Sequence, residues 1–327
     1  MTSLATLPPR PGTGGRIRRL LAVSDGAYRG ALGTVAALFV VLLVVFVTAL
    51  VVQARPAFAH FGFSFLTSTK WDPVHVHYGV LVFLVGTLET TAIALMVAFP
   101  IGLGCALALA FGIPERLRVI LGPAVELLAA VPSVVYGLWG LLVVAPWVRT
   151  VIEPALGHIT GGHEPFGGSQ IGVGLLLAGL ILSIMILPTM VAISRDVLLA
   201  VPGVEIEGAF ALGATRWQVM RRVVVPSARG GILGATTLAT GRAMGETIAV
   251  TMVIGNTDHF AHSLFGTTQT MASLIANEFT EATEPFHLAA LIGVGLLLLV
   301  VAVVVNLAAR LLVRSVGRQR AFGIGVL

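Results

Sequence analysis

Six apolar stretches constrain this chain more than any other feature of its sequence. Each is as long as, or longer than, the roughly 20 residues that an α-helix needs to cross a bilayer. With 57% hydrophobic and 11% charged residues, the chain is too apolar for a water-soluble domain. We therefore predict an all-α polytopic membrane protein with six transmembrane helices, at about residues 31–52, 79–111, 117–148, 171–194, 230–256 and 286–312.

The apolar stretches also divide the chain into segments. Residues 1–29 are rich in proline, glycine and arginine and lack apolar periodicity, which indicates a basic tail that is flexible or interfacial. Residues 30–78 then contain the first membrane helix and an outer loop, and residues 79–315 form the main membrane domain with a polar loop at 200–226. Residues 316–327 form a second tail. The second and third apolar stretches exceed the bilayer thickness, so we expect them to tilt or to extend beyond it.

The basic residues lie mostly on one side of the predicted membrane. The first tail, Arg116 and Arg118, the loop from Arg195 to Arg229, and Arg310, Arg314, Arg318 and Arg320 fall on one side; only Arg55, Lys70 and Arg149 fall on the other. By the positive-inside rule, both tails and the 200–226 loop are predicted to be cytoplasmic. Membrane topology explains the net charge of +5, so we expect contact with membrane lipid and no nucleic-acid partner.

A polar segment between two apolar blocks, residues 202–226, has the local chemistry of two short helices joined by a glycine turn. Gly213 is suited to the left-handed conformation that ends a helix. Thr215 and Gln218 have the spacing of a capping box that begins the next helix. Phe210 and Leu212 are available to fill a groove on a partner protein. The alternative is an ordinary helix-turn-helix loop without a partner.

Four charged residues fall inside the predicted spans: Glu89, Glu126, Arg242 and Glu246. Charges at membrane depth are costly, so each is a candidate functional residue. Arg242 and Glu246 have the i, i+4 spacing of one helix face. An arginine in that position can hold an oxyanion, while the carboxylate neutralises it or accepts a proton. The alternative is a structural ion pair, such as Arg242 with Glu126.

Prolines interrupt two of the spans. Pro132 precedes Ser133 in the third span, and Pro188 lies in the fourth. A broken helix at membrane depth lines a cavity or packs on protein, although a simple kink explains the same prolines. We therefore include Ser133 and Tyr136 in the predicted substrate path, together with Thr247 beside Glu246.

Several kinds of site are missing from the sequence. It contains no G-x-x-x-x-G-K-[ST], G-x-S-x-G or H-E-x-x-H pattern, so we expect no catalytic residues and no bound cofactor on this chain. Its histidines and single cysteine lack the spacing of a ligand set, so we expect no metal site. Any energy that the protein uses must then come from a partner.

The segments described above resemble the permease subunits of ABC importers. Glu207, Ala209, Gly213 and Pro226 match the pattern by which such permeases dock onto their ATPase, although Gly208 replaces the usual first alanine. Other matching segments narrow the resemblance to the PstC branch of phosphate-specific importers. They are residues 65–68 with 71–73, 126–140, 241–250 and 271–278.

The resemblance implies a type I importer fold in a prokaryotic inner membrane, with Glu207, Ala209, Phe210, Gly213 and Pro226 in ATPase coupling. It also implies a paired PstA-type permease in a heterodimer, a homodimeric ATPase, an extracytoplasmic phosphate-binding protein, and inorganic phosphate moved by alternating access. Three alternatives remain open. They are a permease for sulfate or molybdate, a proton-coupled secondary transporter using Glu89, Glu126 and Glu246, and a membrane assembly factor.

Overall fold

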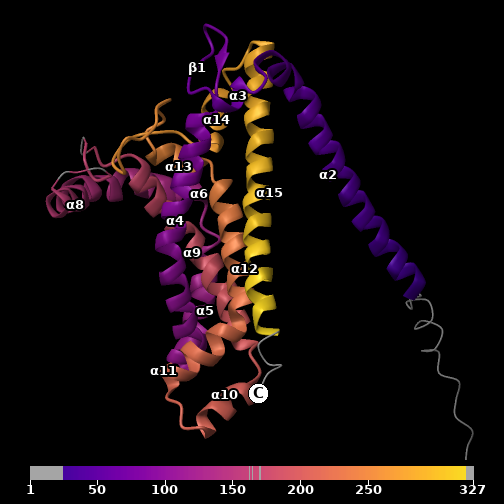
Figure 1. Ribbon diagram of the computed structural model, residues 1–327, viewed down its shortest axis with the longest axis vertical. Coiled ribbons are helices and arrows are strands. Elements are labelled where there is room, and N and C mark those ends of the chain that lie inside the picture. Colours follow the sequence, from indigo (N-terminus) through magenta and orange to yellow (C-terminus); the bar gives the residue numbers. More distant parts are fainter. Residues whose placement is uncertain (1–24, 162, 164, 169–170, 322–327) are drawn as a thin grey trace, which may run out of the picture. The chain divides into compact units, whose positions relative to one another are not determined.

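The computed structural model describes residues 25–161, 163, 165–168 and 171–321, and most of them are helical (Figure 1). The chain divides into two compact units, residues 1–52 and 53–327. Most of the predicted basic tail, 1–29, lies outside the described residues, and its last five residues already belong to helix α2. Of the second predicted tail, 316–327, helix α15 includes the residues up to Ala321.

Among the described residues, five helical segments are long and apolar enough to cross a membrane. They are α2 (Asp25–Phe61), α4 (Leu81–Leu107) with the π-helical segment η1 (Ala108–Gly112), the segment that begins at Ser133, α9 (Leu175–Leu199) and α15 (Pro285–Ala321). Of these five segments, α9 has the largest share of buried residues. It packs against α4 and α12 (Val225–Met244). The count of six membrane helices stays a prediction, because the glycines and threonines of α12 make it less apolar than the other five.

The third predicted span, 117–148, has the wrong bounds. Helix α5 (Glu115–Leu128) ends before Pro132, and a separate helix begins at Ser133. This second helix runs to Thr160 as α6 (Ser133–Trp139), η2 (Gly140–Val144), α7 (Ala145–Trp147), η3 (Val148–Ile152) and α8 (Glu153–Thr160), with η2 and η3 both π-helical. Residues 149–160, which lie between the third and fourth predicted spans, are therefore helical.

Helix α8 is fixed by a buried carboxylate. Glu153 is 2% exposed, and both of its oxygens accept the backbone N–H of Gly172 at 3.1 Å. Gly172 has a φ of +81°, and a methyl group in place of its hydrogen would lie 2.4 Å from the carbonyl oxygen of Ala145. Only glycine fits this close approach.

The two prolines predicted to interrupt spans behave differently. Pro132 follows the break after α5, as expected, and the segment 129–132 is non-helical. Pro188 does not interrupt its span, since α9 continues through it to Leu199. A helix tolerates proline when neighbouring groups satisfy the freed carbonyl. The fifth predicted span, 230–256, is also divided, because α12 ends at Met244 and α13 (Ile248–Val253) begins after residues 245–247.

At the end of unit 53–327 where the β1–β2 hairpin lies, segments distant in sequence form one cluster. Helix α3 (Ser64–Thr67), strands β1 (Trp71–Asp72) and β2 (His77–Tyr78), and helix α14 (Met271–Glu278) meet there, and the strands pair antiparallel with Trp71 opposite Tyr78. The Trp71 indole donates to Glu278 at 2.8 Å, and His287 contacts the same carboxylate oxygen at 2.9 Å. Burial raises the pKa of Tyr78, and the carboxylates of Glu284 and Glu278 raise it further. The segments 65–73 and 271–278, which both belong to the PstC-like pattern, thus pack together.

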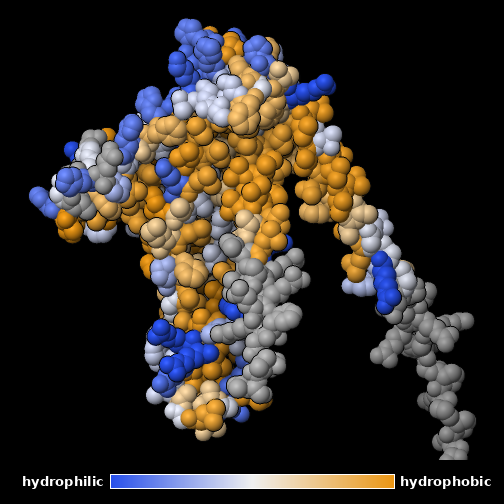
Figure 2. Space-filling model, in the orientation of Figure 1, coloured by the Kyte–Doolittle hydropathy of each residue, from blue (hydrophilic) through white to orange (hydrophobic). Residues whose placement is uncertain are grey.

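The polar 200–226 loop lies at the opposite end of this unit from the β1–β2 hairpin (Figure 1). Figure 2 shows an apolar band over the middle of the helices and hydrophilic residues at both ends. This distribution is the one expected for helices whose middle parts are surrounded by lipid.

Candidate functional site

Arg242 lies in the last turn of α12, where its side chain connects three elements. Its Nη1 donates to Thr189 Oγ1 on α9 at 3.0 Å, and its Nη2 donates to the carbonyl oxygen of Ala129 at 3.5 Å. Both acceptors are neutral. Among the described residues, no carboxylate forms an ion pair with this guanidinium. Its positive charge therefore stays available to a ligand.

The two divided spans converge near this arginine. Ala129 belongs to the break between α5 and α6, and Arg242 stands just before the break between α12 and α13. The helices that follow the two breaks pack closely, since a methyl group on Gly137 would lie 2.9 Å from the Cα of Ala249. Arg242 thus contacts the first break and lies directly beside the second.

Glu246 is not on the same helix face as Arg242, which corrects the i, i+4 prediction. Helix α12 ends at Met244 with Gly245 as its C-cap, because glycine has low helix propensity. The Glu246 carboxylate instead accepts the backbone N–H of Ala249 at 3.4 Å, in the first turn of α13. An acidic group there complements the helix dipole. Thr247 is the N-cap residue of α13 by position, and its hydroxyl donates to the carbonyl oxygen of Gly245 at 3.2 Å.

Tyr136 and Ser133 lie on α6, just after the first break. The Tyr136 hydroxyl donates to the carbonyl oxygen of Leu128 at 2.9 Å. This hydrogen bond joins α6 to the end of α5 and holds the break in one geometry. Ser133 is half-buried in the first turn of α6.

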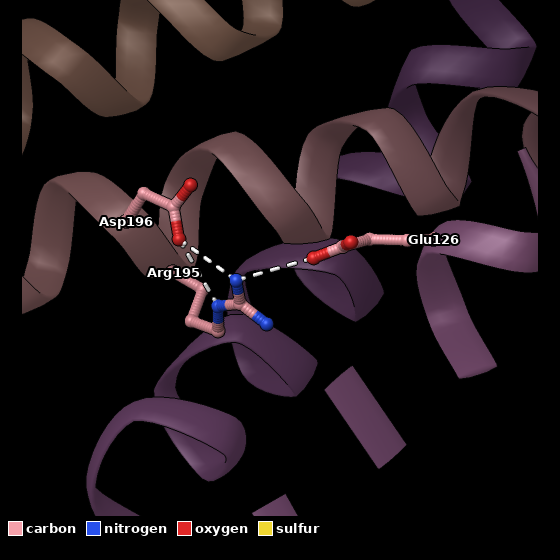
Figure 3. Close-up of polar contacts among 3 residues, drawn as sticks. All are labelled: Glu126, Arg195 and Asp196. Atoms are coloured by element: carbon pink, nitrogen blue, oxygen red, sulfur yellow. Dashed lines mark hydrogen bonds and ion pairs between the residues drawn. The ribbon is translucent and has the colours of Figure 1, made fainter. Parts of the chain in front are cut away.

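Glu126 forms an ion pair with Arg195 rather than with Arg242 (Figure 3). Arg195 Nη2 lies 3.3 Å from Glu126 and 2.9 Å from the carboxylate of Asp196, so it joins α5 to α9. The hypothesis of a structural Arg242–Glu126 pair is therefore wrong. Sequence reasoning treated Arg195 only as a loop charge, although the Arg195–Asp196 pair directly follows an apolar stretch.

An open cavity of about 630 Å³ adjoins Arg242. Its lining comes from α9, α12 and α15, and three of the six α12 residues that line it are glycines. The polar lining residues from the other helices were not predicted as site residues, because only their positions in space connect them to Arg242. They are Thr189, Asn306 and Arg310.

The 200–226 loop has the predicted local structure. Helix α10 (Gly203–Ala211) is followed by Gly213 with a φ of +82°, and then by α11 (Arg216–Val219) and the π-helical segment η4 (Met220–Val224). Thr215 and Gln218 form the capping box, with Gln218 accepting from the Thr215 N–H at 2.8 Å. The predicted helix, glycine turn and second helix are confirmed.

The two faces of α10 differ in what they contact. Ala209 packs against the apolar cluster beneath the loop, and Glu205 accepts the Ser227 hydroxyl at 2.9 Å. Glu207 and Phe210 are exposed, as is Leu212 after the helix, at 91%. Pro226 lies in the first turn of α12. Exposed apolar groups on a small helix held from behind form a surface suited to a protein partner.

Residues 98–318 match the family of binding-protein-dependent transport system inner membrane components. The chain belongs to this family. Its relatives include the phosphate transport system permease proteins PstC of Mesorhizobium japonicum and Pasteurella multocida, each 43% identical to it. The first match covers 89% of this chain and 90% of the relative; the second covers 86% and 90%.

A solved structure of the MetNI methionine ABC transporter has the same fold as this permease. Its matching chain gives a TM-score of 0.52 at 20% identity, over 76% of this chain and 99% of that one. The fold class predicted from the sequence, that of an ABC importer permease, is confirmed.

Proposed function

We propose that this chain is the membrane-spanning permease subunit of an ATP-driven phosphate importer, in which it forms half of the translocation path. The observation that supports this most directly is the Arg242 guanidinium, which two neutral oxygens orient and no described carboxylate neutralises. A guanidinium offers a planar fork of donors that matches the oxygens of a phosphate. The names of its relatives favour the same substrate.

The proposed partners follow from the surfaces of the permease. The exposed side of the 200–226 loop docks a homodimeric ATPase, which binds ATP and Mg²⁺, so this chain needs no cofactor. A PstA-type permease completes the path, and an extracytoplasmic phosphate-binding protein delivers the anion to the end where β1 and α14 lie. ATP-driven approach of the two loops then opens the path alternately to either side of the inner membrane.

Uptake by the reconstituted importer tests this function. We expect phosphate accumulation in proteoliposomes that requires ATP and the binding protein and is not inhibited by a tenfold excess (about one order of magnitude) of sulfate or molybdate. Uptake driven by a proton gradient without ATP would support the secondary transporter instead. Uptake of sulfate in place of phosphate would reassign the substrate while keeping the transport mechanism.

The proposed orientation has its own test. In a background in which Cys105 is replaced by alanine, a cysteine at Val74 is expected to react with an impermeant thiol reagent outside the cell, because Val74 is 85% exposed in the outer hairpin. A cysteine at Leu212, which is 91% exposed in the cytoplasmic loop, is expected to react only after the membrane is permeabilised. The opposite labelling pattern contradicts the orientation.

A further inference from the structure

The cavity beside Arg242 continues along α15. Helix α12 begins at the cytoplasmic loop, whereas α15 begins next to α14 at the outer end, so the two packed helices run in opposite directions. Asn306 lies opposite Gly241, since a methyl group on Gly241 would be 3.4 Å from Asn306 Nδ2. This contact places Asn306 at the depth of Arg242.

Arg310 lies one helical turn beyond Asn306 on the same face of α15. Residues four positions apart in an α-helix are separated by about 6 Å along its axis. Because α15 runs toward the cytoplasmic end, Arg310 is the deeper of the two on the inward side. Both residues line the same cavity of about 630 Å³ as Arg242.

The charges around this cavity are unbalanced. Arg242 and Arg310 are its two charged lining residues, and neither forms an ion pair with any residue that the structure describes. The buried Oδ1 of Asn306 also lacks a hydrogen-bond partner among the described residues, and as an acceptor it can receive the P–OH proton of a hydrogen phosphate. Two neighbouring cations without a carboxylate raise the local concentration of anions.

The opposite wall leaves room for an anion. On α12, a methyl group on Gly230 or Gly234 would meet no atom within 4 Å. Larger side chains at these positions would fill part of the space beside Arg310. The cavity therefore combines two guanidiniums, a carboxamide and an open wall.

We propose that Arg310 and Asn306 form a second binding station for a tetrahedral oxyanion, which receives phosphate from Arg242 on its way to the cytoplasm. This proposal rests on the proposed function and adds a specific release step to it. The Arg310 fork replaces the hydrogen bonds that the anion loses on leaving Arg242, and the Asn306 amide donates a further one. A station of this kind lowers the barrier to inward movement without taking part in the first capture.

The net negative headgroup of an anionic lipid such as phosphatidylglycerol could bind the same cations, whereas zwitterionic phosphatidylcholine has no net charge, so the test must separate lipid from free phosphate. The complete importer is reconstituted in vesicles of phosphatidylcholine alone, and initial uptake of radiolabelled phosphate is measured over a range of concentrations. We expect Arg310→Gln to lower the maximal rate by about tenfold, because a charge-assisted contact is lost, and to change the apparent KM by less than about twofold. Asn306→Ala is expected to lower the maximal rate by about threefold.

Arg229→Gln is the matched control. This variant removes a positive charge from the same side of the membrane, but Arg229 does not line the cavity, so uptake is expected to equal that of the wild type. If Arg310→Gln assembles poorly, Arg310→Lys and Asn306→Ala provide the test, with the ATPase rate as the measure of assembly. Lowered uptake at a normal ATPase rate supports the station.

Three results would overturn the proposal. The first is wild-type uptake by both Arg310→Gln and Asn306→Ala. The second is a defect that occurs only in vesicles containing phosphatidylglycerol, which assigns Arg310 to lipid. The third is absence of phosphate uptake by the wild-type importer, which contradicts the proposed function as well. In the first two cases wild-type uptake persists, so the proposed function stands and only the second station fails.

Discussion

Arg195 contacts the last turn of α5 and Arg242 contacts the break that follows it, yet their surroundings differ. Arg195 contacts two carboxylates, Glu126 and Asp196. Arg242 contacts the Thr189 hydroxyl and the Ala129 carbonyl oxygen and lies beside a cavity. An arginine neutralised on two sides connects helices, whereas one held by neutral acceptors keeps its charge for a ligand. The partners of a charge within the membrane helices, and not its depth alone, therefore distinguish a structural role from a binding role.

The two arginines are expected to differ most when each is replaced by lysine. Arg242→Lys keeps the charge but loses the planar fork, so we expect phosphate uptake to fall by about a hundredfold. Arg195→Lys still provides a cation for its two carboxylates, and we expect uptake within about threefold of the wild type. Uptake is measured at equal membrane abundance. Equal tolerance of lysine at both positions would contradict the distinction.

Removal of the charges in pairs sharpens the comparison. Arg195→Gln leaves Glu126 and Asp196 without their cation, so we expect membrane abundance to fall by about threefold and to recover partly when Glu126→Gln is added. Arg242→Gln is not expected to recover uptake when Glu246→Gln is added, because Glu246 contacts α13 instead of Arg242. Immunoblots of membranes and uptake assays give the two quantities. Full uptake by the Arg242→Gln/Glu246→Gln variant excludes an essential anion contact.

The smallest effect is expected at the break that Arg242 contacts. Tyr136→Phe removes the hydrogen bond to Leu128 across the break, which stabilises the fold by about 1 kcal/mol. We expect uptake to fall by about twofold and the detergent-solubilised protein to unfold at a slightly lower temperature. Ser133→Ala, which removes a hydroxyl from the first turn of the same helix, serves as the control for a small change on α6. A larger loss in the serine variant would shift the binding role toward Ser133.

Local chemistry allowed some features to be predicted from the sequence. The Gly213 turn and the Thr215–Gln218 capping box depend on residues within a few positions of one another, so their patterns are visible in the chain. The apolar stretches likewise predicted most membrane helices. The positions of these helices along the chain follow from hydropathy, which is read directly from the sequence.

Long-range contacts explain what the sequence did not reveal. Thr189 and Ala129 are 53 and 113 residues from Arg242, and no spacing rule connects them. The i, i+4 rule also assumed a continuous helix through Gly245, where α12 ends. Arg195 was missed for a related reason, because its partner Glu126 is 69 residues away.

The two π-helical segments between α6 and α8 bear on how this chain can change in length over generations. A π-helical turn corresponds to about one additional residue within an α-helix. Each residue rotates the following helix by about 100°. A lineage that lost one residue within 140–144 would keep an unbroken helix and yet turn Glu153 away from Gly172. A shortened helix would therefore lose the buried contact between Glu153 and the Gly172 N–H without any break in its helical structure.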